Sequence, residues 1–84
     1  MAWGDDMYEY PRLKDCRNDK ELTQTEVGDL LGIDQRVYSN YETGKRQIPL
    51  HFLIKLAMFY KTSLDYLAGL TSNPAPYERK RMNQ

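Results

Sequence analysis

The chain of 84 residues contains one cysteine and one histidine, so little of its sequence suits metal or thiol chemistry. A single cysteine cannot form an internal disulfide, and metal sites need several ligands at set spacings, so no metal site is predicted. Cys16 has no His or Asn partner in a catalytic motif, so we expect a buried apolar residue rather than a nucleophile. His51 is expected at the surface.

The sequence also lacks the patterns of membrane proteins and of enzymes. It has no apolar run long enough to span a membrane, and its N-terminus lacks the pattern of a signal peptide. We therefore expect a cytoplasmic protein, which agrees with the sparse cysteine. No glycine-rich phosphate loop, no Cys/His cluster and no paired carboxylates in an apolar setting occur. The sequence thus predicts neither an enzyme nor a cofactor, and no small-molecule substrate.

Charge is balanced in number but not in distribution. Twelve basic and twelve acidic residues give a net charge of zero, a weak argument against a nucleic-acid partner. Residues 1–10 contain acidic side chains and no basic one, whereas basic residues occur at Arg36, Lys45 and Arg46 and near the end of the chain. Opposite surfaces of the molecule are therefore expected to carry net charges of opposite sign.

Composition divides the chain into one domain, residues 10–70, and two tails. With 40% hydrophobic residues the chain can bury one compact core without a metal or disulfide. Residues 1–9 are expected to form a flexible acidic tail, in which Trp3 either rests loosely on the domain or anchors a partner contact. Residues 71–84 are expected to form a flexible basic tail. The basic cluster in this tail, Arg79, Lys80 and Arg81, either follows a phosphate backbone or is simply solvated.

Residues 23–46 carry the patterns of two short helices joined by a tight turn. Thr23 and Glu26 have the spacing of a capping box, in which each side chain binds the other residue's free backbone N–H. A helix should therefore begin at Gln24. Its apolar face, with spacings of three and four, comprises Val27, Leu30 and Leu31.

The turn that follows is predicted from two glycines and an aspartate. Gly28 stands in mid-helix, where glycine costs roughly 1 kcal/mol relative to alanine, so we expect the next helix to pass close to it. Gly32 suits a left-handed residue at the end of the helix. Asp34 suits the cap of a second helix, from Gln35 to about Glu42.

The second helix of this pair has two different sides. At about 100° per residue, Tyr38 and Tyr41 lie on one side, which should face the core. The opposite side and its edges comprise Gln35, Arg36, Val37, Ser39 and Asn40. Arginine can make two hydrogen bonds to guanine in the major groove, and Gln or Asn can make two to adenine. Val37 either touches a thymine methyl or belongs to the edge of the core.

Three further helices are expected around this pair. The first runs from about Tyr10 to Asp19, with Pro11 in its first turn and Arg17 pointing outward. A central packing helix of about Pro49 to Phe59 follows the pair, and a short helix from Leu64 to Ala68 ends the domain. The apolar residues of the central helix, expected in the core or at its edge, are Leu50, Leu53, Ile54, Leu56, Ala57, Met58, Phe59 and Tyr60.

Several runs, in this order and spacing, resemble one known family. They are RLKDCR, LTQTEVGDLLGI, YSNYETGKR, PLHFLIKLA and SLDYLAGL. Together they resemble the Cro and phage-repressor helix-turn-helix proteins, also called xenobiotic-response-element-like regulators, over about residues 10–70. The resemblance implies an all-α fold, a compact five-helix lambda-repressor-like DNA-binding domain.

The resemblance also implies roles for individual residues. Base contacts are implied for Gln35, Arg36 and Asn40, and the helical periodicity adds Val37 and Ser39. Phosphate contacts are implied for Gln24 at the start of the second helix, and for Thr43, Lys45 and Arg46 in the loop after the third.

Four positions depart from the family pattern, among them Val37, where the family usually has a small or polar residue. Glu21 and Lys61 occupy positions where the family often has a turn glycine, so either each adopts a left-handed conformation or the turns are reshaped. Asp34 stands where Ser or Thr is more usual. It caps a helix equally well, but its charge opposes phosphate binding unless the side chain is turned away.

The function predicted from these patterns is a sequence-specific DNA-binding transcription regulator, a repressor that binds a two-fold operator in double-stranded DNA. A single helix reads only a few base pairs, so a homodimer with its reading helices about 34 Å apart is expected. Candidate residues for the dimer interface are Leu64, Tyr66, Leu67 and Leu70, although the three leucines either meet a second subunit or close the core. The alternative is a protein-interaction module, such as an antitoxin or adaptor, on the same scaffold. The polar outward face of residues 35–43 favours DNA.

Overall fold

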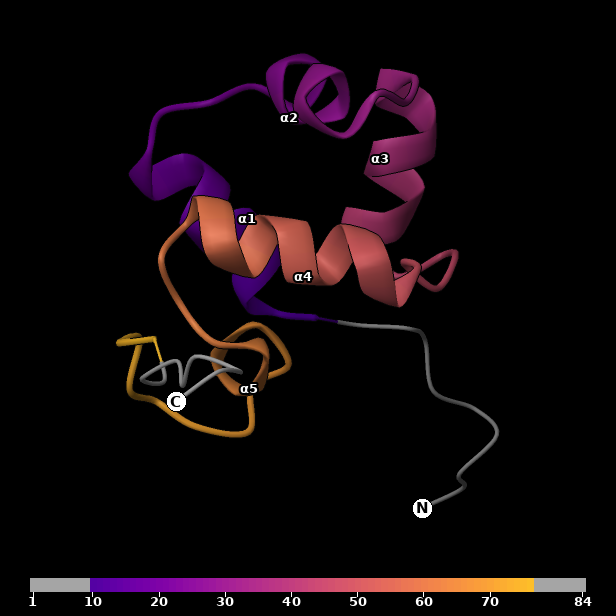
Figure 1. The fold of residues 1–84 in the computed structure, drawn as a ribbon. Coiled ribbons are helices and arrows are strands. Elements are labelled where there is room, and N and C mark those ends of the chain that lie inside the picture. The colour runs from indigo at the N-terminus through magenta and orange to yellow at the C-terminus, as the bar shows by residue number, and fades with distance from the viewer. Residues whose placement is uncertain (1–9, 77–84) are drawn as a thin grey trace, which may run out of the picture.

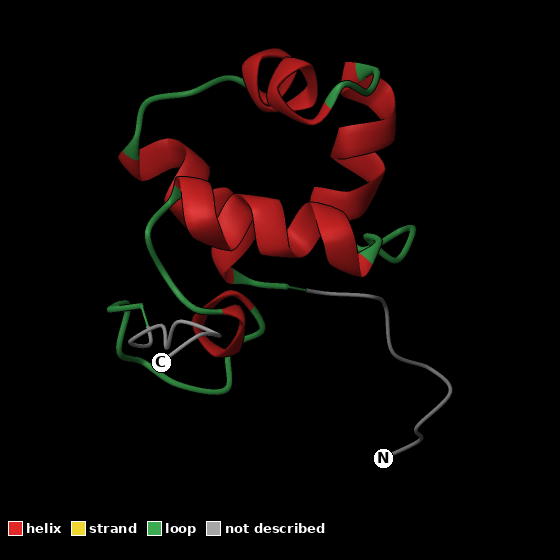
Figure 2. Ribbon diagram, in the orientation of Figure 1, coloured by secondary structure: helices red, strands yellow, loops and turns green. Residues whose placement is uncertain are grey.

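The part of the chain described by the computed structural model, residues 10–76, consists of helices joined by turns and loops (Figure 1). The helices are α1 (Arg12–Asp19), α2 (Gln24–Leu31), α3 (Gln35–Glu42), α4 (Leu50–Phe59) and α5 (Leu64–Leu67). Among these residues there is no strand (Figure 2), and no helix is long and apolar enough to cross a bilayer. The all-α, five-helix fold is confirmed. The predictions for Trp3 and for Arg79, Lys80 and Arg81 fall outside the described residues.

Helix α2 begins as its sequence predicts. The Glu26 amide donates to the Thr23 hydroxyl at 3.1 Å, and the Thr23 amide donates to the Glu26 carboxylate at 2.8 Å. Each bond satisfies a backbone N–H that the helix itself leaves without a partner. The predicted capping box is confirmed, and it sets the first residue of α2 at Gln24.

Gly28 allows α2 and α3 to approach closely. A Cβ atom at this position would lie 2.9 Å from the carbonyl oxygen of Ile33 and 3.5 Å from the Cα atom of Gln35. Gly32 then ends α2 in the left-handed region, at a φ of 74°. The expected close passage of backbone at Gly28 is confirmed, and it fixes the short turn between the two helices.

All five helices meet in one core. Its largest fully buried side chains, one from each helix, are Leu13, Val27, Tyr38, Leu56 and Leu67. Burying an apolar side chain of this size contributes roughly 1.5–3 kcal/mol to the stability of the fold. Each helix therefore contributes a similar amount to the core. In Figure 1, α4 lies in the middle of the molecule, with α2 above it and α5 below.

The prediction for α4 was wrong for part of its apolar surface. Leu53, Leu56 and Ala57 face the core as expected, but Leu50 is 62% exposed. Also exposed are Ile54, Met58 and Phe59. Because α4 is apolar on nearly every side, its sequence does not indicate which stripe the neighbouring helices cover.

The two turns without glycine adopt the left-handed conformation. Glu21 and Lys61 each have a φ of 57°. The residue after each completes a Schellman motif, in which Leu22 donates to the Arg17 carbonyl at 3.0 Å and Thr62 to the Ala57 carbonyl at 2.8 Å. These hydrogen bonds offset the cost of a left-handed residue that has a side chain.

Candidate nucleic-acid interface

Helix α3 is anchored by its tyrosines and capped at its start. Tyr38 is fully buried, and Tyr41 is half-buried with its ring centroid 6.3 Å from that of Phe52. The Asp34 carboxylate accepts a 2.7 Å hydrogen bond from the Arg36 amide, as expected for the helix cap. The opposite side of α3 is therefore held facing away from the core.

The Arg36 side chain projects from this outward side. It is 88% exposed, and its Nε donates to the Asp34 carboxylate at 3.3 Å. A guanidinium carries five N–H donors, so this one bond leaves most of the group available to a partner. The hydrogen bonds from the Arg36 amide and then from its guanidinium hold the pKa of Asp34 below its ordinary value. The lowered pKa keeps Asp34 ionised, so its negative charge remains at the surface beside the Arg36 guanidinium.

The other predicted base-contact residues also lie at the surface of α3. Val37 is exposed, so it belongs to the surface and not to the core edge. Three are half-buried: Gln35, Ser39 and Asn40. All five predicted residues therefore retain some accessible surface on α3, with Arg36 the most exposed.

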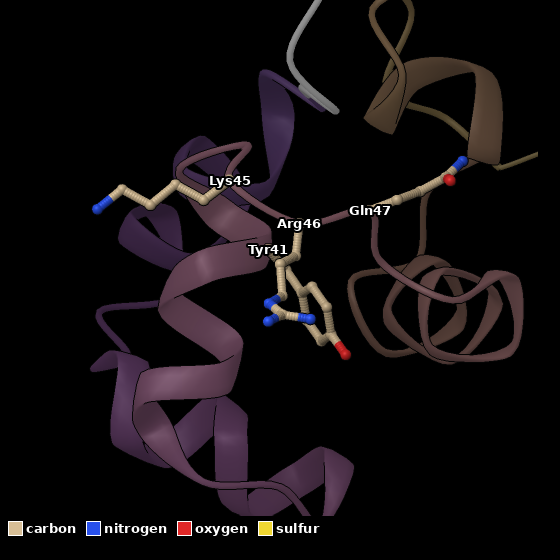
Figure 3. A pocket seen from close by; sticks show the side chains of 4 residues that line it. All are labelled: Tyr41, Lys45, Arg46 and Gln47. Carbon is tan, nitrogen blue, oxygen red and sulfur yellow. The ribbon is translucent and has the colours of Figure 1, made fainter.

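The turn after α3 presents two basic side chains. The amides of Lys45 and Arg46 both donate to the Asn40 carbonyl, at 2.9 and 3.1 Å, and both side chains are exposed. Thr43 is exposed as well, and its hydroxyl donates to the Ser39 carbonyl at 2.8 Å. A shallow, open hollow beside this turn is lined by Tyr41, Lys45, Arg46 and Gln47 (Figure 3). These backbone hydrogen bonds hold Lys45 and Arg46 at the end of α3, so both positive side chains start next to its outward side.

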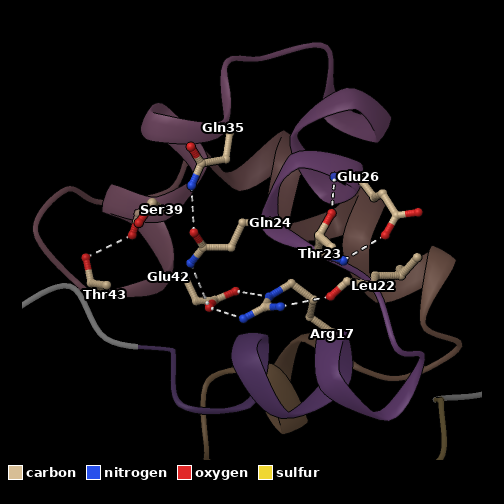
Figure 4. A network of polar contacts seen from close by, with 9 residues as sticks. All are labelled: Arg17, Leu22, Thr23, Gln24, Glu26, Gln35, Ser39, Glu42 and Thr43. Atoms are coloured by element: carbon tan, nitrogen blue, oxygen red, sulfur yellow. Dashed lines mark hydrogen bonds and ion pairs between the residues drawn. The ribbon is translucent and has the colours of Figure 1, made fainter.

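Gln24, the predicted phosphate contact on α2, belongs to a chain of polar contacts (Figure 4). Its Oε1 accepts a 2.8 Å hydrogen bond from Nε2 of Gln35, and its own Nε2 donates to the Glu42 carboxylate at 3.2 Å. The start of α2 is thereby joined to both ends of α3. This arrangement was not predicted, because Gln24 and Glu42 lie 18 positions apart and no local spacing reports their contact.

The chain of contacts ends in a buried ion pair between α1 and α3. Arg17 binds Glu42 through Nε at 2.8 Å and Nη2 at 2.9 Å, and it donates from Nη1 to the Leu22 carbonyl at 2.8 Å. The two side chains are only 12% and 3% exposed. The prediction that Arg17 points outward was wrong, because the periodicity of α1 cannot reveal an acidic partner on another helix.

Burial and hydrogen bonding oppose each other at Glu42. Burial raises the pKa of its carboxyl, but hydrogen bonds, first from Arg17, outweigh burial and hold the pKa below its ordinary value. The Gln24 amide also donates to this carboxylate, at 3.2 Å, and lowers its pKa further. Glu42 is therefore a carboxylate at neutral pH.

The residues predicted for a dimer interface differ in exposure. Leu67 is fully buried in the core, so of its two expected roles it closes the core, and its assignment to the dimer interface was wrong. Leu64 and Tyr66 are half-buried, and the Arg12 guanidinium lies 4.7 Å from the centroid of the Tyr66 ring. Leu70 is 77% exposed. Three of the four candidates therefore retain accessible surface.

A capped helix, a tight turn and a second helix with hydrogen-bonding side chains turned outward define a helix-turn-helix DNA-binding domain. The helix-turn-helix family matches residues 13–67, and the chain belongs to the Cro and phage-repressor type of this family. The fold and the sequence comparison thus agree on a DNA-binding domain of the transcription-regulator class.

The relatives of the chain are regulators from Bacillus subtilis (strain 168). It is 36% identical over 74 residues to the uncharacterized HTH-type transcriptional regulator YobD, covering 87% of this chain and 66% of YobD. It is 39% identical over 66 residues to YqaE, with coverage of 79% and 57%, and 41% identical over 56 residues to the SPbeta prophage-derived YonR, with coverage of 67% and 52%. The chain thus spans about half to two thirds of these relatives' lengths. No solved structure matches it significantly.

Proposed function

We propose that this protein is a transcription repressor that binds a two-fold operator in double-stranded DNA as a homodimer, with α3 in the major groove. The observation that carries the proposal is the contrast across α3, where Tyr38 is fully buried and the Arg36 side chain is 88% exposed. A helix anchored on one side can present rigid donors and acceptors to base edges on the other. Such a regulator would act in the cytoplasm.

Arg36 is the main base-reading residue in this proposal. Its free guanidinium donors match the two acceptors, N7 and O6, that guanine presents in the major groove. Gln35 and Asn40 would each pair with an adenine, through one donor and one acceptor. Ser39 would add a hydrogen bond, and the exposed methyls of Val37 would pack on a thymine methyl.

Phosphate contacts would hold α3 in the groove. Lys45 and Arg46 supply exposed positive charge beside the end of α3. Gln24 keeps one N–H besides the one that it donates to Glu42, and Thr43 would turn its hydroxyl from the Ser39 carbonyl to a phosphate. Contacts of this kind set orientation and overall affinity but carry no sequence information.

We propose a homodimer because one helix can contact only a few base pairs. Two reading helices about 34 Å apart would contact two half-sites on one side of the duplex. The exposed Leu70, with the half-buried Leu64 and Tyr66, is the proposed interface.

Selection of bound duplexes from a random DNA pool tests this function directly. The proposal predicts enrichment of a palindromic consensus, because two identical subunits read two identical half-sites. A pool that remains random after selection would contradict it.

The alternative function, a protein-interaction module, has one observation in its favour. Helix α4 exposes apolar side chains four residues apart, at Leu50, Ile54 and Met58. If random-pool selection gave no consensus and the Leu50→Glu variant lost binding to a protein captured by the wild type, this alternative would be preferred.

A further inference from the structure

We propose that Asp34 is a positioning residue, which holds the Arg36 guanidinium with its end toward the bases and away from the phosphates of DNA. The inference rests on the proposed function, since it requires Arg36 to read a guanine. It concerns a position where this chain departs from the family pattern, because Ser or Thr is more usual there. The contacts that carry it join Asp34 to both the backbone and the side chain of Arg36.

The Asp34 carboxylate is itself held by the backbone of α3. Its Oδ1 atom accepts the 2.7 Å hydrogen bond from the Arg36 amide that caps the helix. The same oxygen accepts a hydrogen bond from Nε of Arg36 at 3.3 Å. An acceptor fixed by the helix therefore meets a side chain that has several rotatable bonds, and it restricts the directions in which the guanidinium can point.

The contact with Nε leaves one edge of the guanidinium complete. Of its five N–H donors, one is on Nε and two are on each of Nη1 and Nη2. Asp34 takes the Nε donor and so occupies half of the side edge of Arg36. The end edge keeps one donor from each Nη atom. Two parallel donors match O6 and N7 of guanine, whereas adenine presents one acceptor and one donor in the major groove.

The charge of Asp34 acts in the same direction. The hydrogen bond from the Arg36 amide, and then that from its guanidinium, hold the pKa of Asp34 below its ordinary value, so the group is ionised at neutral pH. A carboxylate repels phosphates, which every DNA sequence offers and which carry no sequence information. Asp34 therefore makes a phosphate contact by Arg36 less favourable and leaves the contact with guanine open.

The contact lies at the surface, so its expected effect is on recognition and not on stability. The side chains of Asp34 and Arg36 are 55% and 88% exposed. Ion pairs with this exposure contribute little to stability in water. When DNA covers α3, water is displaced and the same attraction becomes stronger. The pair therefore matters most in the complex, and a substitution can change base preference while the fold stays intact.

The test measures binding of full-chain variants to the selected duplex, to its single-base variants and to a random-sequence duplex. Asp34→Ser keeps a side chain that caps a helix about as well as aspartate, but it removes the charge and the contact with Nε. Circular dichroism should show that this variant folds as the wild type does. Asp29→Ser, at an exposed position of α2, removes the same charge from another helix and is the matched control. Arg36→Ala identifies the base pair that Arg36 reads.

We expect Asp34→Ser to lower the preference for guanine at that base pair by roughly 2- to 12-fold, the effect of one hydrogen bond. The affinity of this variant for the random-sequence duplex should rise by roughly 2- to 5-fold, because a negative charge is removed beside the phosphates. Asp29→Ser should keep the wild-type preference for guanine. In the Arg36→Ala background, Asp34→Ser should change no base preference, because Asp34 acts through Arg36.

Three results would overturn the inference, and they are distinguishable. If Asp34→Ser kept the guanine preference that Arg36→Ala loses, the positioning role would be wrong and the proposed function would stand. If Asp34→Ser weakened binding to every duplex by the same factor, Asp34 would act only as the cap of α3. If Arg36→Ala changed no base preference, Arg36 would not read DNA, and the inference would fail together with that part of the proposed function.

Discussion

Arg17 and Glu42, 25 positions apart in the sequence, form a bidentate ion pair with N···O distances of 2.8 and 2.9 Å. The pair joins α1 to the end of α3 and is almost excluded from solvent. Removing one member leaves the other as an unpaired charge in the protein interior, which is costly.

Loss of Arg17 should therefore destabilise the fold. We expect Arg17→Met to lower the free energy of unfolding by roughly 3 kcal/mol, because Glu42 would remain buried without its partner. Urea unfolding followed by circular dichroism measures the change. Lys14→Met on the exposed side of α1 is the matched control and should change stability by less than about 0.5 kcal/mol. Equal losses in the two variants would contradict the importance of the pair.

Stability should also fall in acid through Glu42. The pKa of its carboxyl is lower in the folded protein than its ordinary value of 4.5, so its stabilising contribution is complete above that pH. This contribution is lost as the pH falls through the folded pKa, because protonation then requires the ion pair to break. Urea unfolding at a series of pH values should show a smaller acid-induced loss in Glu42→Gln than in the wild type. Identical pH profiles would contradict this assignment.

Gly28→Ala tests the close contact between α2 and α3. Alanine favours a helix by roughly 1 kcal/mol over glycine, but its Cβ would lie 2.9 Å from the Ile33 carbonyl oxygen, which belongs to the backbone. We expect the steric term to prevail, with a net loss of roughly 1–3 kcal/mol in unfolding free energy and weaker DNA binding. Thr25→Ala, at an exposed position of the same helix, should be nearly neutral. A more stable Gly28→Ala protein would show that the turn relaxes easily.

The dimer interface can be located with two leucine variants. Leu70→Glu should shift the protein toward monomer in analytical ultracentrifugation, because it places a charge in the proposed apolar contact. Leu50→Glu, on the exposed side of α4, should leave the association unchanged. The reverse result would move the interface from the end of the domain to α4.

Local patterns predicted the fold well where each element is specified by its own residues. Thr23 and Glu26 identify the start of α2, and Asp34 identifies the start of α3, because their hydrogen bonds span only two or three residues. The position of Gly28 likewise predicted the close approach of the next backbone. These interactions join residues that are close in the sequence, so the sequence alone is enough to recognise them.

The parts that sequence did not predict depend on contacts between distant elements. Arg17 was expected in solvent because its partner, Glu42, lies on another helix. Leu50 was expected in the core because α4 is apolar on nearly all sides, and only the assembled fold shows which side remains open. The sequence left open whether Leu67 closes the core or meets a second subunit, and the assembled fold buries its whole side chain in the core.

The central claim, that α3 reads bases, is tested most directly by fluorescence anisotropy titrations of Arg36→Ala and Lys45→Ala against the selected duplex and its single-base variants. Arg36→Ala should cost roughly 1–3 kcal/mol and abolish the preference at one base pair. Lys45→Ala should weaken binding to all sequences and reduce the salt slope by about 1. Should Arg36→Ala weaken every duplex by the same factor, Arg36 would not be a base reader, and the account would be contradicted.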